Sequence, residues 1–338
     1  MPTPHEQAEA HRASRARLID STTARALHTW RMADVEALDA SWDVIAPVLV
    51  DSVAEAQIVA ASAATAYTAA AVSASAAPTV TPEAFAGVTL DGREVGPAMF
   101  GAVTTTKSFI GRGASAARAF EAGAAFLATI VKSSVADAGR QADRVQATAH
   151  TVTRYVRVIR PGACSRCAIL AGTGSYSTAF QRHPNCRCTA YPLADPAEGV
   201  PDGFYSSPSD YFESLPKGEQ DRIFTEAGAR AIRDGADFSQ VVNARRGLVA
   251  PPKRGLTAPL GYDRDGKPIK VLTTSEGTTI RGAFGRAEYR RQAEFKKGAG
   301  DRYRRTTNQR LMPETIYGIA RGDTTKAKEL LEFYGYLS

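Results

Sequence analysis

The chain has 338 residues, of which 43% are hydrophobic and 23% charged, and its formal net charge is +7. This length and apolar content allow a sizeable core divided over two or three domains. The polar first 20 residues lack the apolar region of a signal peptide, and the longest uncharged stretch, residues 56–82, holds few large apolar side chains. We therefore expect a protein made in the cytosol, with neither a secretion signal nor a transmembrane span.

The positive charge is concentrated towards the C-terminus. Residues 251–338 hold 18 Lys and Arg against 10 Asp and Glu, whereas the rest of the chain is close to neutral. An asymmetry of this kind indicates contact with a polyanion or with an acidic protein surface.

The first 150 residues predict helices, because large apolar side chains recur every three or four residues and form one stripe. Pro47 is expected to interrupt the helix. The Ala-rich segment 48–77 then either packs against a neighbouring helix or another subunit, or lies as a plain surface helix. After a turn at Asp91-Gly92, helical pattern resumes over about 97–150. The apolar residues of the first stripe are Leu18, Leu27, Trp30, Val35, Leu38 and Trp42.

The pattern changes after this helical region. Residues 151–160, TVTRYVRVIR, are β-branched and partly alternating, and they predict a strand. Short helices are expected beyond the cysteines, one opened by Pro208 and one capped by Asp237 and closed by Gly247.

The last quarter of the chain predicts a linker followed by basic helices. Residues 248–280 contain VAPPKRG and GYDRDGKP and have little structural pattern of their own. A basic helix is expected over about 286–297, and Pro313 begins a final pair of helices. The linker implies that residues 281–338 fold apart from the segment before it.

All four cysteines lie in residues 162–188, in the pattern C-x2-C followed by H-x2-C-x-C. Three interpretations compete: a disulfide framework, a redox dithiol and a metal site. A disulfide framework suits a small secreted domain, and a redox dithiol leaves the second half of the pattern unexplained. Clustered thiolates and an imidazole fit tetrahedral zinc, with five candidates for four positions. The candidate ligands are Cys164, Cys167, His183, Cys186 and Cys188.

A structural role is expected for this zinc ion. Catalytic zinc keeps one position open for water, whereas four or five sulfur and imidazole ligands close the coordination shell. The sequence also lacks the H-E-x-x-H motif and the deaminase motifs.

The residues VRVIRPGACSRCAILAG, followed by HPNCRC, resemble the C-terminal domain of the phage Mu F-like minor head proteins. The later segments SDYFESLPKGEQDRIFTEAGARAIRDGADFSQVVNARRG and RLMPETIYGIARGD are similar to versions found in tailed phages of actinobacteria. The resemblance implies a minor capsid or head-morphogenesis protein associated with the portal, with the five candidate ligands in the motif. It covers most of the chain and is weakest in the first 150 residues.

Proteins of this architecture are also labelled capsid maturation proteases, so an enzyme remains the alternative, with a zinc-dependent nuclease as a weaker one. A serine protease needs a nucleophile, a histidine base and an orienting carboxylate. Three histidines lie in the Ala-rich helical arm and His183 lies in the cysteine cluster, so only His150, at the end of a helix, remains, and no G-x-S-x-G motif occurs. We therefore expect a protein that is not an enzyme.

The segment 281–310 combines basic and aromatic residues and is the candidate contact region for packaged DNA or an acidic partner. Cations neutralise phosphates, and aromatic rings stack on bases or cover apolar surface. A solvated basic helix, or one that docks on an acidic portal or capsid surface, explains the pattern equally well. The candidate contact residues are Arg290, Arg291, Lys296, Lys297, Arg302, Arg304 and Arg305.

Together these features predict a mainly α, multi-domain protein with a small zinc-stapled α+β module. The expected function is that of a structural minor capsid protein inside the virion, with the portal and major capsid proteins as partners, possible non-specific contact with DNA and no membrane. The expected domains are an Ala-rich helical domain (1–150), a zinc-binding module (151–247), a linker (248–280) and a basic helical region (281–338).

Overall fold

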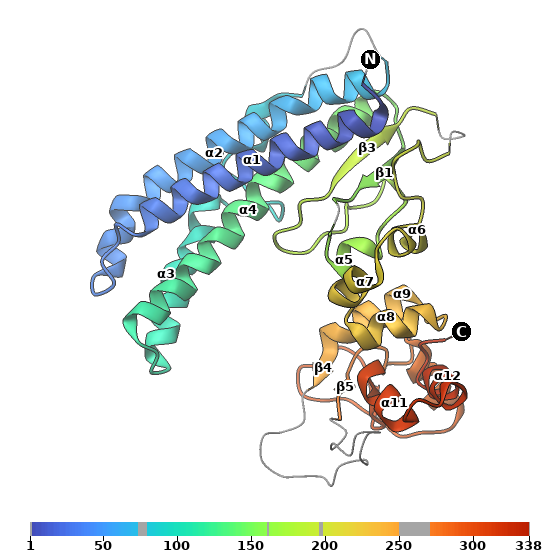
Figure 1. Cartoon of the computed structure of the whole chain (residues 1–338). Coiled ribbons are helices and arrows are strands. Elements are labelled where there is room, and N and C mark those ends of the chain that lie inside the picture. Colours follow the sequence, from blue (N-terminus) through green and yellow to red (C-terminus); the bar gives the residue numbers. More distant parts are fainter. Residues whose placement is uncertain (1, 74–79, 161, 196–198, 250–270, 338) are drawn as a thin grey trace. The chain divides into compact units, whose positions relative to one another are not determined.

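The computed structural model describes residues 2–73, 80–160, 162–195, 199–249 and 271–337. The chain is mostly helical, with small sheets, and this confirms the predicted fold class (Figure 1). It forms two compact units. Unit 1 contains Met1–Pro161 and Leu170–Ser207, and unit 2 contains Gly162–Ile169 and Pro208–Ser338.

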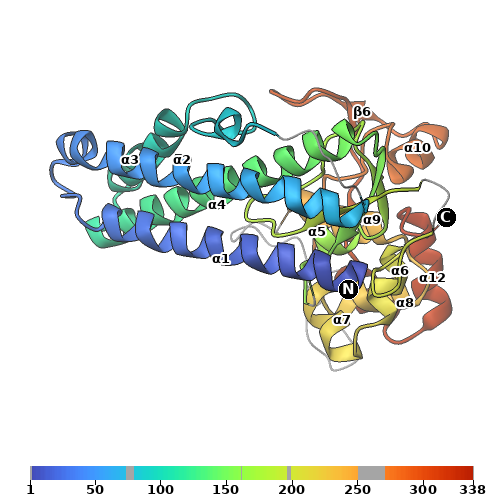
Figure 2. The same ribbon diagram turned by 90° about the horizontal axis from the view of Figure 1, so that it is seen from above.

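Four long helices dominate unit 1. The helices α1, α2 and α4 run side by side, and α3 packs against α2 and α4 (Figure 2). The helices of unit 1 are α1 (Pro4–Trp30), α2 (Leu38–Ala71), α3 (Val95–Gly111) and α4 (Ala116–Ala149), with a short 3-10 helix, η1 (Pro82–Phe85).

The predicted apolar stripe forms the core between these helices. Trp30 of α1 is buried and stacks on Phe120 of α4 with ring centroids 5.0 Å apart. Gly123 permits this close approach, because a Cβ atom there would lie 2.9 Å from the Trp30 ring. The Ala-rich helix packs against a neighbouring helix of the same chain, since its small residues lie against α4. The Ala-rich contact consists of Ala61, Ala64 and Ala142.

Pro47 does not interrupt the helix, so the expected break there is wrong. It lies inside α2, on the exposed face. A proline removes one hydrogen bond to the carbonyl four residues earlier. Here that carbonyl belongs to the exposed residue Asp43, which water can reach, while Ile45 and Leu49 are buried on the opposite face. Core burial on one face and hydration on the other thus allow the helix to continue.

The helical pattern expected over 97–150 is two helices rather than one. The break lies between α3 and α4, where Gly113 has a φ of +83°. That left-handed conformation is accessible to glycine and reverses the chain direction. The predicted turn at Asp91-Gly92 is confirmed, since Gly92 has a φ of +81° and its amide donates to the Thr89 carbonyl at 2.9 Å.

By length and composition alone, α2 and α4 are each apolar enough to cross a membrane. The core helices of globular proteins meet the same criterion. Both helices contribute to one apolar core, in which Leu49 of α2 and Leu127 of α4 have no exposed surface. Packing between these two helices therefore accounts for the apolar side chains that are buried there, although others, such as Val44 and Val48 of α2, are exposed.

A three-stranded antiparallel sheet completes unit 1, in the order β2-β1-β3. The predicted strand segment 151–160 contains its central strand, in which Val156 and Val158 are buried against Tyr67 of α2. The strands are β1 (Arg154–Val158), β2 (Thr173–Ser175) and β3 (Thr189–Leu193).

Unit 2 combines short helices with two small sheets, of order β4-β5-β8 and β6-β7. Helices were predicted to begin at Pro208, after Asp237 and at Pro313, and all three predictions are confirmed. The Asp237 side chain accepts a hydrogen bond from the Gln240 amide at 2.8 Å. Its elements are α5 (Ser165–Ala168), α6 (Pro208–Glu213), α7 (Lys217–Phe224), α8 (Glu226–Arg233), α9 (Phe238–Ala244), η2 (Arg245–Gly247), β4 (Leu248–Val249), β5 (Thr273–Thr274), α10 (Ala283–Arg290), β6 (Phe295–Lys296), β7 (Arg305–Thr306), β8 (Arg310–Leu311), α11 (Pro313–Ala320) and α12 (Thr324–Phe333).

The basic helix expected over 286–297 ends early, at Arg290, and the rest of that segment includes the two-residue strand β6. Gln292, with a φ of +59°, follows the helix and turns the chain. The chain also divides differently from the predicted domains, because the C-terminal segment packs on helices that precede residue 248. The Tyr317 hydroxyl donates to Asp234 at 2.6 Å, and the Asp237 amide donates to the Tyr336 carbonyl at 2.9 Å. Of the predicted linker, residues 250–270 lie outside the described residues.

Candidate metal centre

The first pair of candidate ligands lies on one tight helical turn. Cys164 caps the N-terminus of α5, and the amide of Cys167 donates to the Cys164 carbonyl at 2.9 Å. The preceding carbonyl, that of Ala163, accepts a hydrogen bond from the buried Tyr211 hydroxyl at 3.2 Å. A C-x2-C spacing on such a turn presents two sulfur atoms to the same side, as a shared metal ion requires.

The second group of candidate ligands lies in the connection from β2 to β3. The amide of Cys186 donates to the His183 carbonyl at 3.1 Å, and Asn185 between them has a φ of +63°. Cys188 comes directly before β3. The left-handed turn at Asn185 folds the H-x2-C segment back on itself, and asparagine tolerates this conformation better than most residues.

The ligand atoms form two overlapping groups. Those of Cys167, Cys186 and Cys188 lie within 4.8 Å of one another, and so do those of Cys164, Cys167 and His183. Cys167, Cys186 and Cys188 are each at most 4% exposed. The donors are cysteine sulfur and histidine nitrogen atoms, and they are enough to fill the four positions of a tetrahedral site. This cluster could hold a metal ion.

His183 makes a hydrogen bond with the neighbouring backbone. Its Nδ1 lies 2.7 Å from the carbonyl oxygen of Pro184. A carbonyl only accepts, so Nδ1 donates in this contact. Metal-bound histidines usually donate their second ring N–H to an oxygen in this way.

Arg140 and Asp137, which the sequence analysis did not identify, hold the second group of ligands. The Arg140 guanidinium on α4 donates to the carbonyl oxygens of Cys186 and Cys188, the latter at 3.0 Å from Nε. Asp137, one turn earlier, accepts from Arg140 at 2.6 Å and from Arg182 at 2.6 Å. The spacing of Asp137 and Arg140 on one helix was visible in the sequence. Nothing there indicated that Arg140 contacts Cys186 and Cys188, which lie 46 and 48 residues further along the chain.

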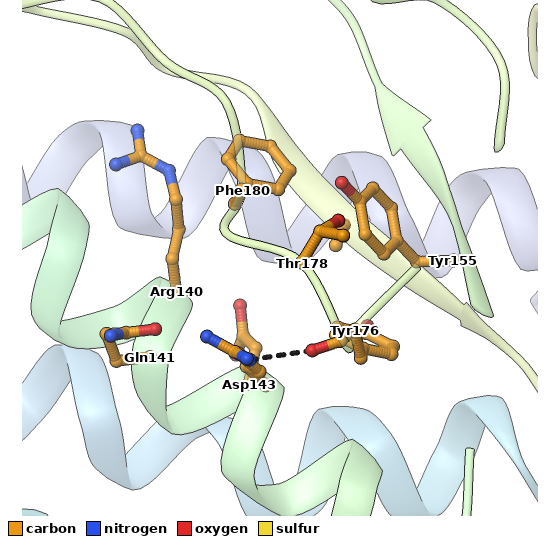
Figure 3. Close-up of a pocket in the computed structure, with 9 residues that line it drawn as sticks. Arg140, Gln141, Asp143, Tyr155, Tyr176, Thr178 and Phe180 are labelled. Carbon is orange, nitrogen blue, oxygen red and sulfur yellow. Dashed lines mark hydrogen bonds between the residues drawn. The ribbon is translucent and has the colours of Figure 1, made fainter. Parts of the chain in front are cut away.

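A small cavity lies beside Arg140, between α4 and the sheet. Its volume is about 10 Å³, which is room for about one water molecule. Figure 3 shows Arg140 and Asp143 on the helix and the rings of Tyr155, Tyr176 and Phe180 across from them. A cavity of this size does not accommodate a small-molecule substrate.

A buried charged cluster joins α1 to α4 and was also missed by the sequence analysis. Arg15 forms two hydrogen bonds to the Asp143 carboxylate, of 2.7 and 3.0 Å, and His11 lies 3.3 Å from the same carboxylate. The His11 ring stacks on Tyr67 with centroids 3.7 Å apart. Burial opposes ionisation of Asp143, but the charges of Arg15 and His11 outweigh it and hold its pKa well below the usual value.

The seven predicted contact residues all lie in unit 2, and several of them make contacts within it. Arg291 pairs with Glu288 at 2.9 Å. Arg305 donates to the Ser275 carbonyl at 2.6 Å, and Lys296 lies 3.2 Å from Glu294. Arg305 is half-buried, and the exposed members are Arg290, Arg291, Lys296, Lys297, Arg302 and Arg304.

Comparison with known proteins places the chain in a family. The model of the VG15 protein family matches residues 2–209, which include α1 to α4, the three-stranded sheet and all the candidate metal ligands. No curated protein and no solved structure matches the chain. Since the matched region is more than half of the 338 residues, the family is established. The chain belongs to the VG15 protein family, a family of viral proteins.

Proposed function

We propose that this viral protein is a structural minor capsid protein of a tailed bacteriophage, which takes part in head morphogenesis beside the portal and stays inside the head. The observation that carries the proposal is the Cys/His cluster, in which the predicted ligands gather. It is the same C-x2-C and H-P-x-C-R-C motif in which the chain resembles the Mu F-like minor head proteins. Membership of a viral family supports the phage assignment.

The metal is proposed to be a structural zinc ion. Cysteine sulfur and imidazole nitrogen are the ligands that zinc prefers in closed tetrahedral sites, and such sites contribute folding energy. The three cysteines of one group are buried, as expected for ligands that water does not reach. When bound, the ion would supply cross-linking of its ligand segments rather than an activated water molecule, because the donors present can fill every position.

The partners are proposed to be the portal protein, the major capsid protein and packaged DNA, the last through non-specific contacts. The basic side chains of the region 281–310 support this, since six of the seven candidate residues are exposed. Phosphate contacts of this kind weaken with increasing salt, by a slope of about 0.9 per neutralised phosphate in a double-logarithmic plot.

The DNA contact is tested by measuring duplex affinity as a function of salt concentration. Lys296→Glu with Lys297→Glu should weaken binding and reduce the salt slope. The matched control, Arg17→Glu with Arg25→Glu, makes the same charge change on exposed positions of α1 and should behave as the wild type. Equal effects in both variants, or binding that does not depend on salt, would show that the region 281–310 is not a phosphate contact.

The capsid role is tested by mass spectrometry of purified heads of the phage that encodes the chain. Full-length protein should be present in heads that have completed DNA packaging, and particles made without it should be defective in assembly. Its absence from completed heads would overturn the assignment as a head component.

A further inference from the structure

We propose that Arg140 is the residue that positions Cys186 and Cys188 for metal binding; this rests on the metal site proposed above. Arg140 is 8% exposed, and its guanidinium reaches from α4 to the carbonyl oxygens of both cysteines. A planar guanidinium that contacts two alternate residues fixes the backbone on either side of Arg187, and thereby the directions of both thiol groups.

Asp137 accepts a hydrogen bond from Arg140 and holds the guanidinium in this position. Its carboxylate is buried and binds Arg140 at 2.6 Å, and it accepts from Arg182, which directly precedes His183, at 2.6 Å. Two arginines therefore share one carboxylate, and each is connected to a different part of the H-x2-C-x-C segment. The segment is thus attached to α4 through hydrogen bonds of its backbone and of the adjoining Arg182.

A second guanidinium, that of Arg157 on β1, approaches the same segment from the sheet. It lies 3.8 Å from the Cys186 sulfur, donates to the Gln181 carbonyl at 2.8 Å and stacks over the Phe180 ring at 4.2 Å. Three or four thiolates around one divalent ion leave excess negative charge in a buried site. Two nearby guanidinium groups would offset that charge, as hydrogen bonds to metal-bound sulfur do.

This arrangement assigns different tasks to the two arginines. Arg140 contacts the ligand residues through their backbone, so its main effect is on geometry, whereas Arg157 contacts a ligand sulfur directly. Lysine cannot replace Arg140, because an ammonium group lacks the flat pair of donors that reach two carbonyl oxygens together. Arg140→Lys therefore keeps the charge and loses the positioning.

The test compares two arginines on the same helix. Arg144, one turn after Arg140, also donates to a backbone carbonyl, that of Tyr176 at 2.9 Å, but Tyr176 is not a candidate ligand. The purified full chain would be titrated with zinc against a chromogenic chelator and with cobalt, whose thiolate charge-transfer absorption reports on ligand geometry. Circular dichroism would confirm the helical content of each variant.

Arg140→Gln and Arg140→Lys should weaken zinc binding about 10- to 100-fold, the range seen when outer partners of metal ligands are removed. Both should also change the cobalt absorption, whereas Arg144→Gln should leave affinity and absorption close to the wild type. If Arg140→Gln proves unfolded, Arg140→Lys, which retains the buried charge beside Asp137, decides the question.

Wild-type affinity in a folded Arg140 variant would overturn the inference and leave the metal site standing. An equal loss in Arg144→Gln would also overturn it, because the effect would then come from the helix as a whole. If the wild-type chain binds neither zinc nor cobalt, the proposed metal site fails and the inference fails with it.

Discussion

Arg15 and Asp143 form a doubly hydrogen-bonded ion pair inside unit 1, with nitrogen–oxygen distances of 2.7 and 3.0 Å, although 128 residues separate them. Their side chains are 4% and 3% exposed. The pair connects the first helix of the bundle, α1, to the last, α4. A charge pair in such surroundings is costly to break, because the remaining partner stays buried without compensation.

Asp143→Asn should therefore destabilise unit 1 by about 3–5 kcal/mol, the range for removing one partner of a buried pair. The double variant Arg15→Met, Asp143→Leu should recover much of this loss, because the guanidinium and the carboxylate are removed together. Urea unfolding followed by circular dichroism measures both. A single variant as stable as the wild type would show that the pair does not hold α1 on α4.

The same pair predicts an acid dependence of stability. The pKa of Asp143 in the folded chain lies well below its usual value, so folding favours the ionised form. Its contribution is complete above the pKa of an unfolded aspartate, about 3.9, and is lost as the pH falls below that value towards the folded pKa. The difference in unfolding free energy between wild type and the double variant should be constant from pH 7 to 5 and change below about pH 4. A difference that does not vary with pH would contradict this linkage.

Freshly purified protein should contain about one zinc ion per chain, and acid should release it as the ligand thiolates take up protons. Cys164→Ser or Cys167→Ser should remove the ion and unfold the residues around 155–192, while the helices of unit 1 persist by circular dichroism. Metal analysis and alkylation of the thiols provide the measurement. Disulfides in alkylated protein, together with an absence of zinc, would show that the cysteines form a covalent framework instead.

Five candidate ligands compete for four positions around the metal ion. A comparison of His183→Ala with Cys186→Ser tests which of these two residues is a ligand. Cys186 is buried and belongs to the group with Cys167 and Cys188, so its loss should release the zinc. His183 is less buried, and the four cysteines alone can close a tetrahedral site, so His183→Ala should retain zinc near full occupancy. Loss of zinc from His183→Ala, with retention in Cys186→Ser, would reverse the assignment.

Deletion of residues 281–338 should unfold the rest of unit 2 rather than leave it intact. The buried Arg310 donates to the Gln240 side chain at 3.0 Å, and strand β8 pairs with β5. Limited proteolysis should show that α8 and α9 lose protection, while the bundle of unit 1 resists cleavage. The full-length variant Arg286→Ala, at an exposed position of α10, is the control and should keep the wild-type pattern. Continued protection of residues 208–247 in the deletion would restore the boundary predicted from the sequence.

The sequence by itself determined the elements that depend on neighbouring residues. The apolar spacing around Trp30 and Trp42 identified the helices, Asp237 and Pro313 marked helix starts, and the Cys/His spacing identified the candidate ligands. These signals are local, because periodicity, capping and C-x2-C geometry each involve residues within one or two turns of the chain.

The tertiary structure decided whatever depends on contacts distant in sequence. Pro47 remains within a helix because Ile45 and Leu49 are buried on the other face, and no local rule indicates that burial. Arg15 meets Asp143, and Arg140 meets the carbonyl groups of Cys186 and Cys188, only after the helices and the sheet have packed. A buried arginine and an exposed one look alike in a sequence, since the difference lies in which carboxylate or carbonyl oxygen the fold brings within hydrogen-bonding distance.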